Sequence, residues 1–76
     1  PVRRRSILIA RSFDPADKDA EKVAEALIKK GFRTLADLMH RSKAELTEDL
    51  KLDAELVEAY AEGLKQFYFY LPDETT

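Results

Sequence analysis

The sequence contains no cysteine, and only two of its 76 residues are glycine. Without cysteine the chain can form no disulfide, no thiolate metal site and no cysteine nucleophile, and we expect an intracellular setting, cytoplasmic or nuclear. No run of about 18 apolar residues is present, so no segment is predicted to cross a membrane. The chain also lacks a nucleophile–base pair, a glycine-rich phosphate loop and a metal-ligand spacing. These absences predict a domain that is not an enzyme and uses no cofactor and no small-molecule substrate.

Charged residues make up 37% of the chain, and their signs are unevenly distributed although the net charge is only −2. Residues 1–43 carry eleven Lys or Arg against six acids, a net charge of +5. Residues 44–76 carry two Lys or Arg against nine acids, a net charge of −7. If the two halves present separate surfaces, the domain has one basic and one acidic surface.

Residues 1–13 are predicted to form an extended arm. Near its start are Arg3, Arg4 and Arg5, which suit either an arm that binds nucleic acid or an anionic membrane surface, or a solvated linker. The apolar run Ile7 to Ile9 suits a strand, but no second strand-like run is present to pair with it. We therefore expect these side chains to lie over a helical core.

Residues 14–71 are predicted to form a helical domain, followed by a polar tail at residues 72–76. The first helix is expected to begin with Asp14 as N-cap and Pro15 at its first position, and to end at Lys30. Gly31 then occupies the position at which a helix end adopts a left-handed conformation, with Phe32 placed to contact the helix as in a Schellman motif.

Three further helix starts follow. Thr34 and Asp37 form a capping box that starts a short second helix, and Ser42 starts a third helix in the box Ser-x-x-Glu. Asp53 is the expected N-cap of the last helix. Its apolar residues recur at helical spacing as far as Leu71, which predicts one helix of about four turns.

The run Phe67-Tyr68-Phe69-Tyr70 is the most unusual feature of the composition. The helical spacing places Phe67 and Tyr68 on the core face. One helix face cannot hold four consecutive side chains, so if these two are in the core, Phe69 and Tyr70 project elsewhere. They are either covered by residues 7–9 or exposed as anchors for a partner. His40, the only histidine, has no second ligand near it in sequence and reads as an exposed residue at a helix end.

The segment Leu27-Ile-Lys-Lys-Gly31-Phe32-Arg-Thr34-Leu35-Ala-Asp-Leu38, followed by Ser42-Lys-Ala-Glu45-Leu46, resembles helix-hairpin-helix domains of the kind found at the N-terminus of recombinases. More loosely, the chain is similar to sterile alpha motif (SAM) domains. Both belong to the SAM-like superfold, and the resemblance implies an all-α, compact bundle of four to five short helices.

The two families imply different functions. Helix-hairpin-helix domains hold a DNA phosphate on backbone N–H groups of a turn such as Lys30-Gly31-Phe32. The second turn, Leu50 to Asp53, departs from that pattern, because Lys51 stands in the glycine position and would be strained in a left-handed conformation. SAM domains are commonly protein-interaction modules in which the acidic surface of one copy joins the basic surface of another.

We therefore carry two hypotheses forward. The first is a non-catalytic protein–protein interaction module, self-associating through a basic and an acidic face. The alternative is a DNA- or RNA-binding module that uses the Lys30-Gly31-Phe32 turn, although cations at a helix C-terminus are also favourable for the helix alone. The candidate partner-binding residues are Lys29, Lys30, Gly31, Arg33, Glu48, Asp49, Glu55, Glu58, Phe69 and Tyr70, and nucleic acid would be contacted by Arg3, Arg4, Arg5, Lys29, Lys30 and Arg33.

Overall fold

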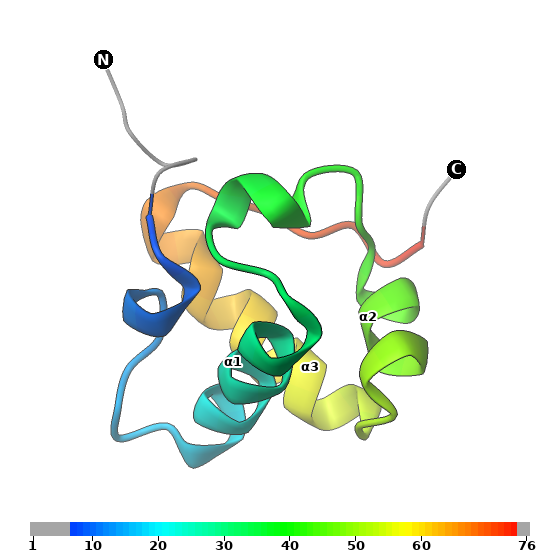
Figure 1. Cartoon of the computed structure of the whole chain (residues 1–76), viewed down its shortest axis with the longest axis horizontal. Helices are drawn as coiled ribbons and strands as arrows, with labels where there is room; N and C mark the ends of the chain where they lie inside the picture. The colour runs from blue at the N-terminus through cyan, green and yellow to red at the C-terminus, as the bar shows by residue number, and fades with distance from the viewer. Residues whose placement is uncertain (1–6, 75–76) are drawn as a thin grey trace.

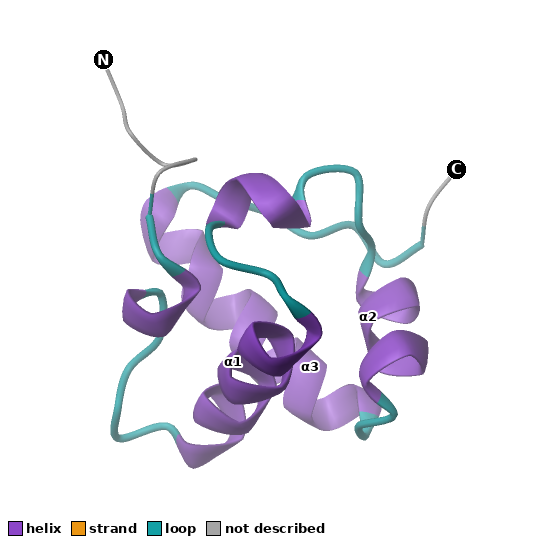
Figure 2. Cartoon of the chain, in the orientation of Figure 1, coloured by secondary structure: helices purple, strands orange, loops and turns teal. Residues whose placement is uncertain are grey.

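A computed structural model describes residues 7–74, and in that part of the chain all regular structure is helical (Figures 1 and 2). Three α-helices are present: α1 (Lys18–Lys30), α2 (Lys43–Leu50) and α3 (Ala54–Leu64). Three short 3-10 segments accompany them: η2 (Ile9–Arg11), η3 (Leu35–Leu38) and η4 (Lys65–Phe67). The all-α class is therefore confirmed. The predicted count of four to five helices is not confirmed, because the predicted second helix is only the short 3-10 segment η3.

The core lies between α1, α2 and α3: α1 and α2 both pack on α3, and they also contact each other. The apolar residues of α1 and α3 recur at helical spacing, so each helix has one apolar face, and these faces are buried in the core. The apolar core residues are Ile9, Ala20, Val23, Ala24, Leu27, Leu35, Leu38, Leu46, Val57, Tyr60, Ala61, Leu64 and Leu71.

The predicted start of the first helix, with Asp14 as N-cap, is wrong. The N-cap is Asp17, whose side chain accepts the Ala20 backbone N–H at 3.2 Å. Asp14 instead forms a turn of its own, since its carboxylate accepts the Ala16 N–H (2.9 Å) and its carbonyl accepts the Asp17 N–H (2.8 Å). Such a local bond offers the backbone an alternative to the helix, which delays the helix by one turn.

The extended arm is not confirmed for its described residues, 7–13, which form part of the folded domain. Ile9 is fully buried, and Leu8 pairs with Thr34 in an isolated antiparallel bridge. Ser12 is also buried and donates its hydroxyl hydrogen to the Ile9 carbonyl at 2.8 Å. Arg3, Arg4 and Arg5 lie outside the described residues.

Ser12 also holds the only tyrosine of the core. The Tyr60 hydroxyl lies 3.0 Å from the Ser12 hydroxyl oxygen. Because the Ser12 hydrogen is already donated to Ile9, Tyr60 is the donor in this pair. Burial raises the pKa of Tyr60 to about 12, so the phenol stays neutral and keeps this hydrogen bond.

The predicted helix of about four turns ending at Leu71 is wrong, because α3 ends at Leu64. After η4, Tyr68 takes a left-handed conformation (φ 58°), and the chain then leaves the helical path. Beyond that point side chains alternate: Phe69 packs on the core and Leu71 is buried, whereas Tyr68 and Tyr70 are 69% and 62% exposed.

The residues after Leu71 return to α2 (Figure 1). The carbonyl oxygens of Pro72 and Asp73 accept the backbone N–H groups of Lys43 (2.8 Å) and Ala44 (3.0 Å). A helix leaves its first N–H groups without intrahelical partners, and here the C-terminal segment supplies them. The predicted Ser42 capping box completes the same helix end, with the Glu45 N–H donating to the Ser42 hydroxyl at 3.1 Å.

Candidate functional site

The turn that follows α1 forms as the sequence predicts. Gly31 is left-handed (φ 106°), its N–H donates to the Ile28 carbonyl, and the Phe32 N–H donates to the Leu27 carbonyl, both at 3.0 Å. These are the two bonds of a Schellman motif. The turn therefore projects the predicted basic residues Lys29, Lys30 and Arg33, which are all exposed.

The next two backbone N–H groups are satisfied by a side chain of the same turn. Asp37 accepts the Arg33 N–H at 2.7 Å and the Thr34 N–H at 3.2 Å through one carboxylate oxygen, Oδ2. These two bonds lower the pKa of Asp37, so the carboxylate is ionised at neutral pH. An anion approaching these backbone donors meets a carboxylate already in place. The turn consequently offers cationic side chains to a partner, but not the N–H groups of Gly31 to Thr34.

A hollow of about 220 Å³ lies beside this turn. Its lining includes Arg41, which sequence reasoning did not select. The Arg41 guanidinium lies 5.4 Å from the centroid of the Phe32 ring, within the range of a cation–π contact. The remaining lining residues are Lys30, Gly31, Phe32 and Asp37. Arg41 stands eight residues after the Arg33 of the turn, in the loop before α2, so only the fold of that loop brings it here.

The four predicted acidic residues do not form one uniform surface. Asp49 lies 3.8 Å from Arg41, which places it beside the basic hollow rather than on a separate acidic surface. Glu58 binds Lys43 at 2.7 Å. Glu48 and Glu55 are exposed and form no ion pair with any residue that the structure describes.

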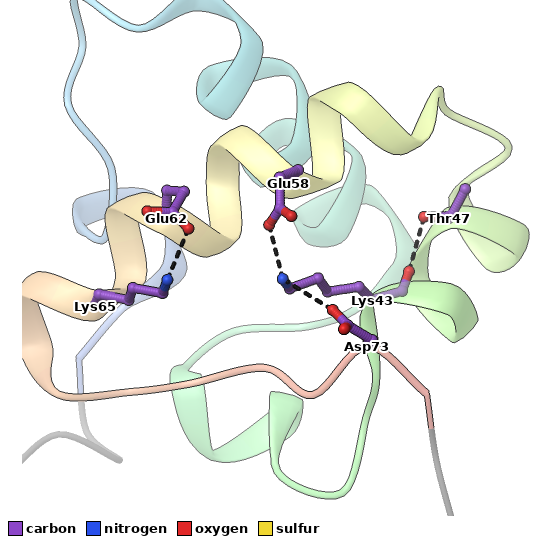
Figure 3. Close-up of polar contacts among 6 residues, drawn as sticks. All are labelled: Lys43, Thr47, Glu58, Glu62, Lys65 and Asp73. Carbon is purple, nitrogen blue, oxygen red and sulfur yellow. Dashed lines mark hydrogen bonds and ion pairs between the residues drawn. The ribbon is translucent and has the colours of Figure 1, made fainter.

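Lys43 connects three elements of the fold (Figure 3). Its ammonium group lies 2.7 Å from Glu58 on α3 and 3.2 Å from Asp73 in the C-terminal segment. The hydrogen bond to Glu58 raises the pKa of Lys43. A cation at the first position of a helix is unfavourable for the helix dipole, and these two carboxylates offset that cost.

A wider groove of about 560 Å³ borders the same cluster. Glu48, Glu58, Asp73 and Glu74 give it an acidic lining, and among residues 7–74 only Lys43 adds a cation to it. The other residues that line it are Ala44, Thr47 and Ala54. Two acids from residues 73–74 therefore join two of the predicted acidic residues, because the C-terminal segment returns to α2.

The two predicted aromatic anchors separate in the structure. Phe69 packs against the core and is half-buried, so it is not an exposed anchor. Tyr70 is exposed, in agreement with the second of the two alternatives, and Tyr68, which was expected on the core face, is exposed as well. Both outcomes follow from the end of the helical path at the left-handed Tyr68, since after it exposed and packed side chains alternate instead of lining one helix face.

The second turn, like the first, contains a left-handed residue, although a lysine stands there in place of glycine. Lys51 is left-handed (φ 55°, ψ 40°), so the strain that we expected did not prevent this conformation. Asp53 is the N-cap of α3 as predicted, but its side chain makes no capping bond.

Among residues 7–74, no group of three or more His, Asp or Glu side chains could hold a metal ion. No helix in that range is long and apolar enough to cross a bilayer. The chain matches no protein-family model, and comparisons with curated proteins and with solved structures also found no match.

Proposed function

We propose that this domain is a non-catalytic protein–protein interaction module that self-associates through its basic and acidic surfaces. The basic surface consists of Lys29, Lys30 and Arg33, and the acidic surface of Glu48, Glu55 and Glu58. The proposal rests mainly on the basic residues around the first turn, which are not neutralised by acidic partners in the described part of the chain. Lys29, Lys30 and Arg33 are exposed and form no ion pair within residues 7–74, whereas the backbone of their turn is hydrogen-bonded internally.

The two surfaces come from different elements, so contact between them is heterologous. The basic residues belong to the end of α1 and its turn, and the acidic residues to α2 and α3. A surface of one copy that meets a different surface of the next copy leaves both ends of the pair able to bind again. Association of this kind grows with concentration, and salt weakens it because exposed charges are screened.

The nucleic-acid alternative retains only the side-chain charges of the turn. Its backbone contribution is opposed by Asp37, which accepts the N–H groups of Arg33 and Thr34. If three to five phosphates were nonetheless neutralised, log affinity for duplex DNA would fall against log salt with a slope of about −3 to −5.

Paired charge reversals test the proposal. Lys30→Glu and Glu48→Lys should each abolish the concentration-dependent increase in mass seen by sedimentation velocity at low salt, about 0.05 M. The double variant carries both reversals in one chain and should associate again. Lys22→Glu serves as the control, because Lys22 is exposed on α1 outside the basic surface.

Each result decides between the hypotheses. Normal association of both single variants contradicts the two-surface contact. A wild-type protein that stays monomeric at all concentrations, and that binds duplex DNA with the salt slope above, replaces the proposal with the nucleic-acid alternative.

A further inference from the structure

We infer that Arg41 and Lys30 form a receptor for carboxylate side chains over the Phe32 ring, and that glutamates of a second copy of this chain occupy it. The inference rests on the proposed self-association and assigns its basic side to a defined hollow. It adds Arg41, a residue outside the basic surface defined above.

The guanidinium of Arg41 is held in place without its donors being used. It stacks on Phe32 at 5.4 Å and its side chain is 42% exposed. The separation of 3.8 Å between Arg41 Nη1 and Asp49 Oδ2 is too long for a hydrogen bond. Within residues 7–74 the planar group therefore retains its N–H donors for a ligand. Since a carboxylate fits such a planar pair of donors bidentately, Arg41 is suited to receive one.

Lys30 also lines the hollow and adds a second positive charge. Two carboxylates lie near these cations, Asp37 and Asp49. Asp37 already accepts two backbone N–H groups, and Asp49 is the distant partner of Arg41 described above. Neither of them hydrogen-bonds the guanidinium.

The chain itself carries the complementary ligand. Glu48 and Glu55 are exposed carboxylates without an ion pair in the described part of the chain. They extend from α2 and from the first turn of α3. A second copy therefore provides long acidic side chains to the two cations of the hollow, neither of which is hydrogen-bonded to a carboxylate of residues 7–74, and this favours a second copy as the occupant.

The test compares two arginines by the same substitution. Arg41→Gln should weaken self-association at low salt by about tenfold or more, as expected for a central contact. Arg11→Gln should leave it within about twofold, because Arg11 is exposed on η2 and away from the hollow. Arg41→Lys keeps the charge but not the planar group, and should give an intermediate loss. Thermal unfolding of each variant, followed by circular dichroism, establishes that the fold is intact.

A mixing experiment identifies the occupant. Arg41→Glu and Glu48→Lys copies should each be monomeric, whereas their mixture should associate. In the mixture the intact Glu48 of one copy meets the intact Arg41 of the other, and the two reversed charges are also complementary. Isolated monomers in the mixture overturn the inference.

The failures of the two proposals are distinguishable. If the wild-type protein does not associate, the proposed function is wrong and this inference with it. If the wild-type protein associates and Arg41→Gln behaves like Arg11→Gln, the hollow is not the receptor while the proposed function stands. Weakened binding of duplex DNA by Arg41→Gln, without any change in self-association, also overturns the inference.

Discussion

The turns that follow α1 and α2 each contain one residue in a left-handed conformation, but they differ in the residue type and in the hydrogen bonds around it. The first uses Gly31 at φ 106° and closes with two Schellman bonds and the Asp37 carboxylate. The second uses Lys51 at φ 55° and leads to an N-cap, Asp53, whose side chain makes no capping bond. The first turn is therefore stabilised by hydrogen bonds among its own residues, whereas the second lies between two helices that pack on each other. Both turns were predicted from local sequence, but a left-handed residue was expected only in the first.

Gly31→Ala should cause the largest change, because it places a side chain on the left-handed residue of the stable turn. We expect a loss of about 1–2 kcal/mol in the free energy of unfolding. The added Cβ has no atom within 4 Å, so the loss arises from the backbone and not from a clash. Urea denaturation measures it as a lower midpoint with an unchanged slope.

Gly63→Ala is the matched control for that variant. Gly63 lies inside α3, its added Cβ also has no atom within 4 Å, and its φ is not positive. The same chemical change should there stabilise the protein by about 0.5–1 kcal/mol. Equal effects at the two glycines would contradict the difference between these positions.

Lys51→Gly gives the second turn a glycine at its left-handed position, as in the first turn. Removal of left-handed strain outweighs the entropy that glycine adds to the unfolded chain, so we expect a gain of up to about 1 kcal/mol in unfolding free energy. Lys51→Ala is the control, since alanine retains the strain. Thermal unfolding measures both variants, and a destabilised Lys51→Gly protein would show that the lysine side chain outweighs its backbone cost.

Asp37→Asn should give a smaller effect that depends on pH. The folded-state pKa of Asp37 is lowered from its usual 3.8, so the ionised form stabilises the fold above that value. As the pH falls through the lowered pKa, this stabilisation is lost. The difference in unfolding free energy between the wild type and Asp37→Asn should therefore be largest at neutral pH and become smaller as the pH falls through the lowered pKa of Asp37.

Asp53→Asn is the matched control for the second turn. Asp53 makes no side-chain capping bond, so this variant should lose less stability at pH 7 than Asp37→Asn does. Chemical denaturation over a series of pH values compares the two. An equal loss at both aspartates would remove the distinction between the capped turn and the uncapped one.

Residues that act within one turn of the chain were predictable. Gly31 and Phe32 ended α1 as expected, and Ser42 with Glu45 formed the capping box that starts α2. These signals need only neighbours three to five residues away. By the same reasoning, Lys29, Lys30 and Arg33 were correctly expected to surround an ordered turn.

The errors at helix ends arose where two local signals competed. Asp14 and Asp17 are both capable N-caps, and the Asx turn of Asp14 left the cap to Asp17. The apolar spacing beyond Leu64 suits a helix as well as an extended segment with alternate burial. In the structure the helix does not continue, because Tyr68 is left-handed, and Phe69 and Leu71 then pack on the core.

By itself the sequence determined the all-helical class, the glycine turn, the capped start of α2 and the unequal charge of the two halves. Each of these depends on composition or on hydrogen bonds between near neighbours. Only the tertiary structure decided that Arg41 lies over Phe32, that Asp49 joins the basic side, and that Asp73 returns to Lys43. The physical reason is that these contacts depend on how loops and helices pack together, which no local spacing of residues encodes.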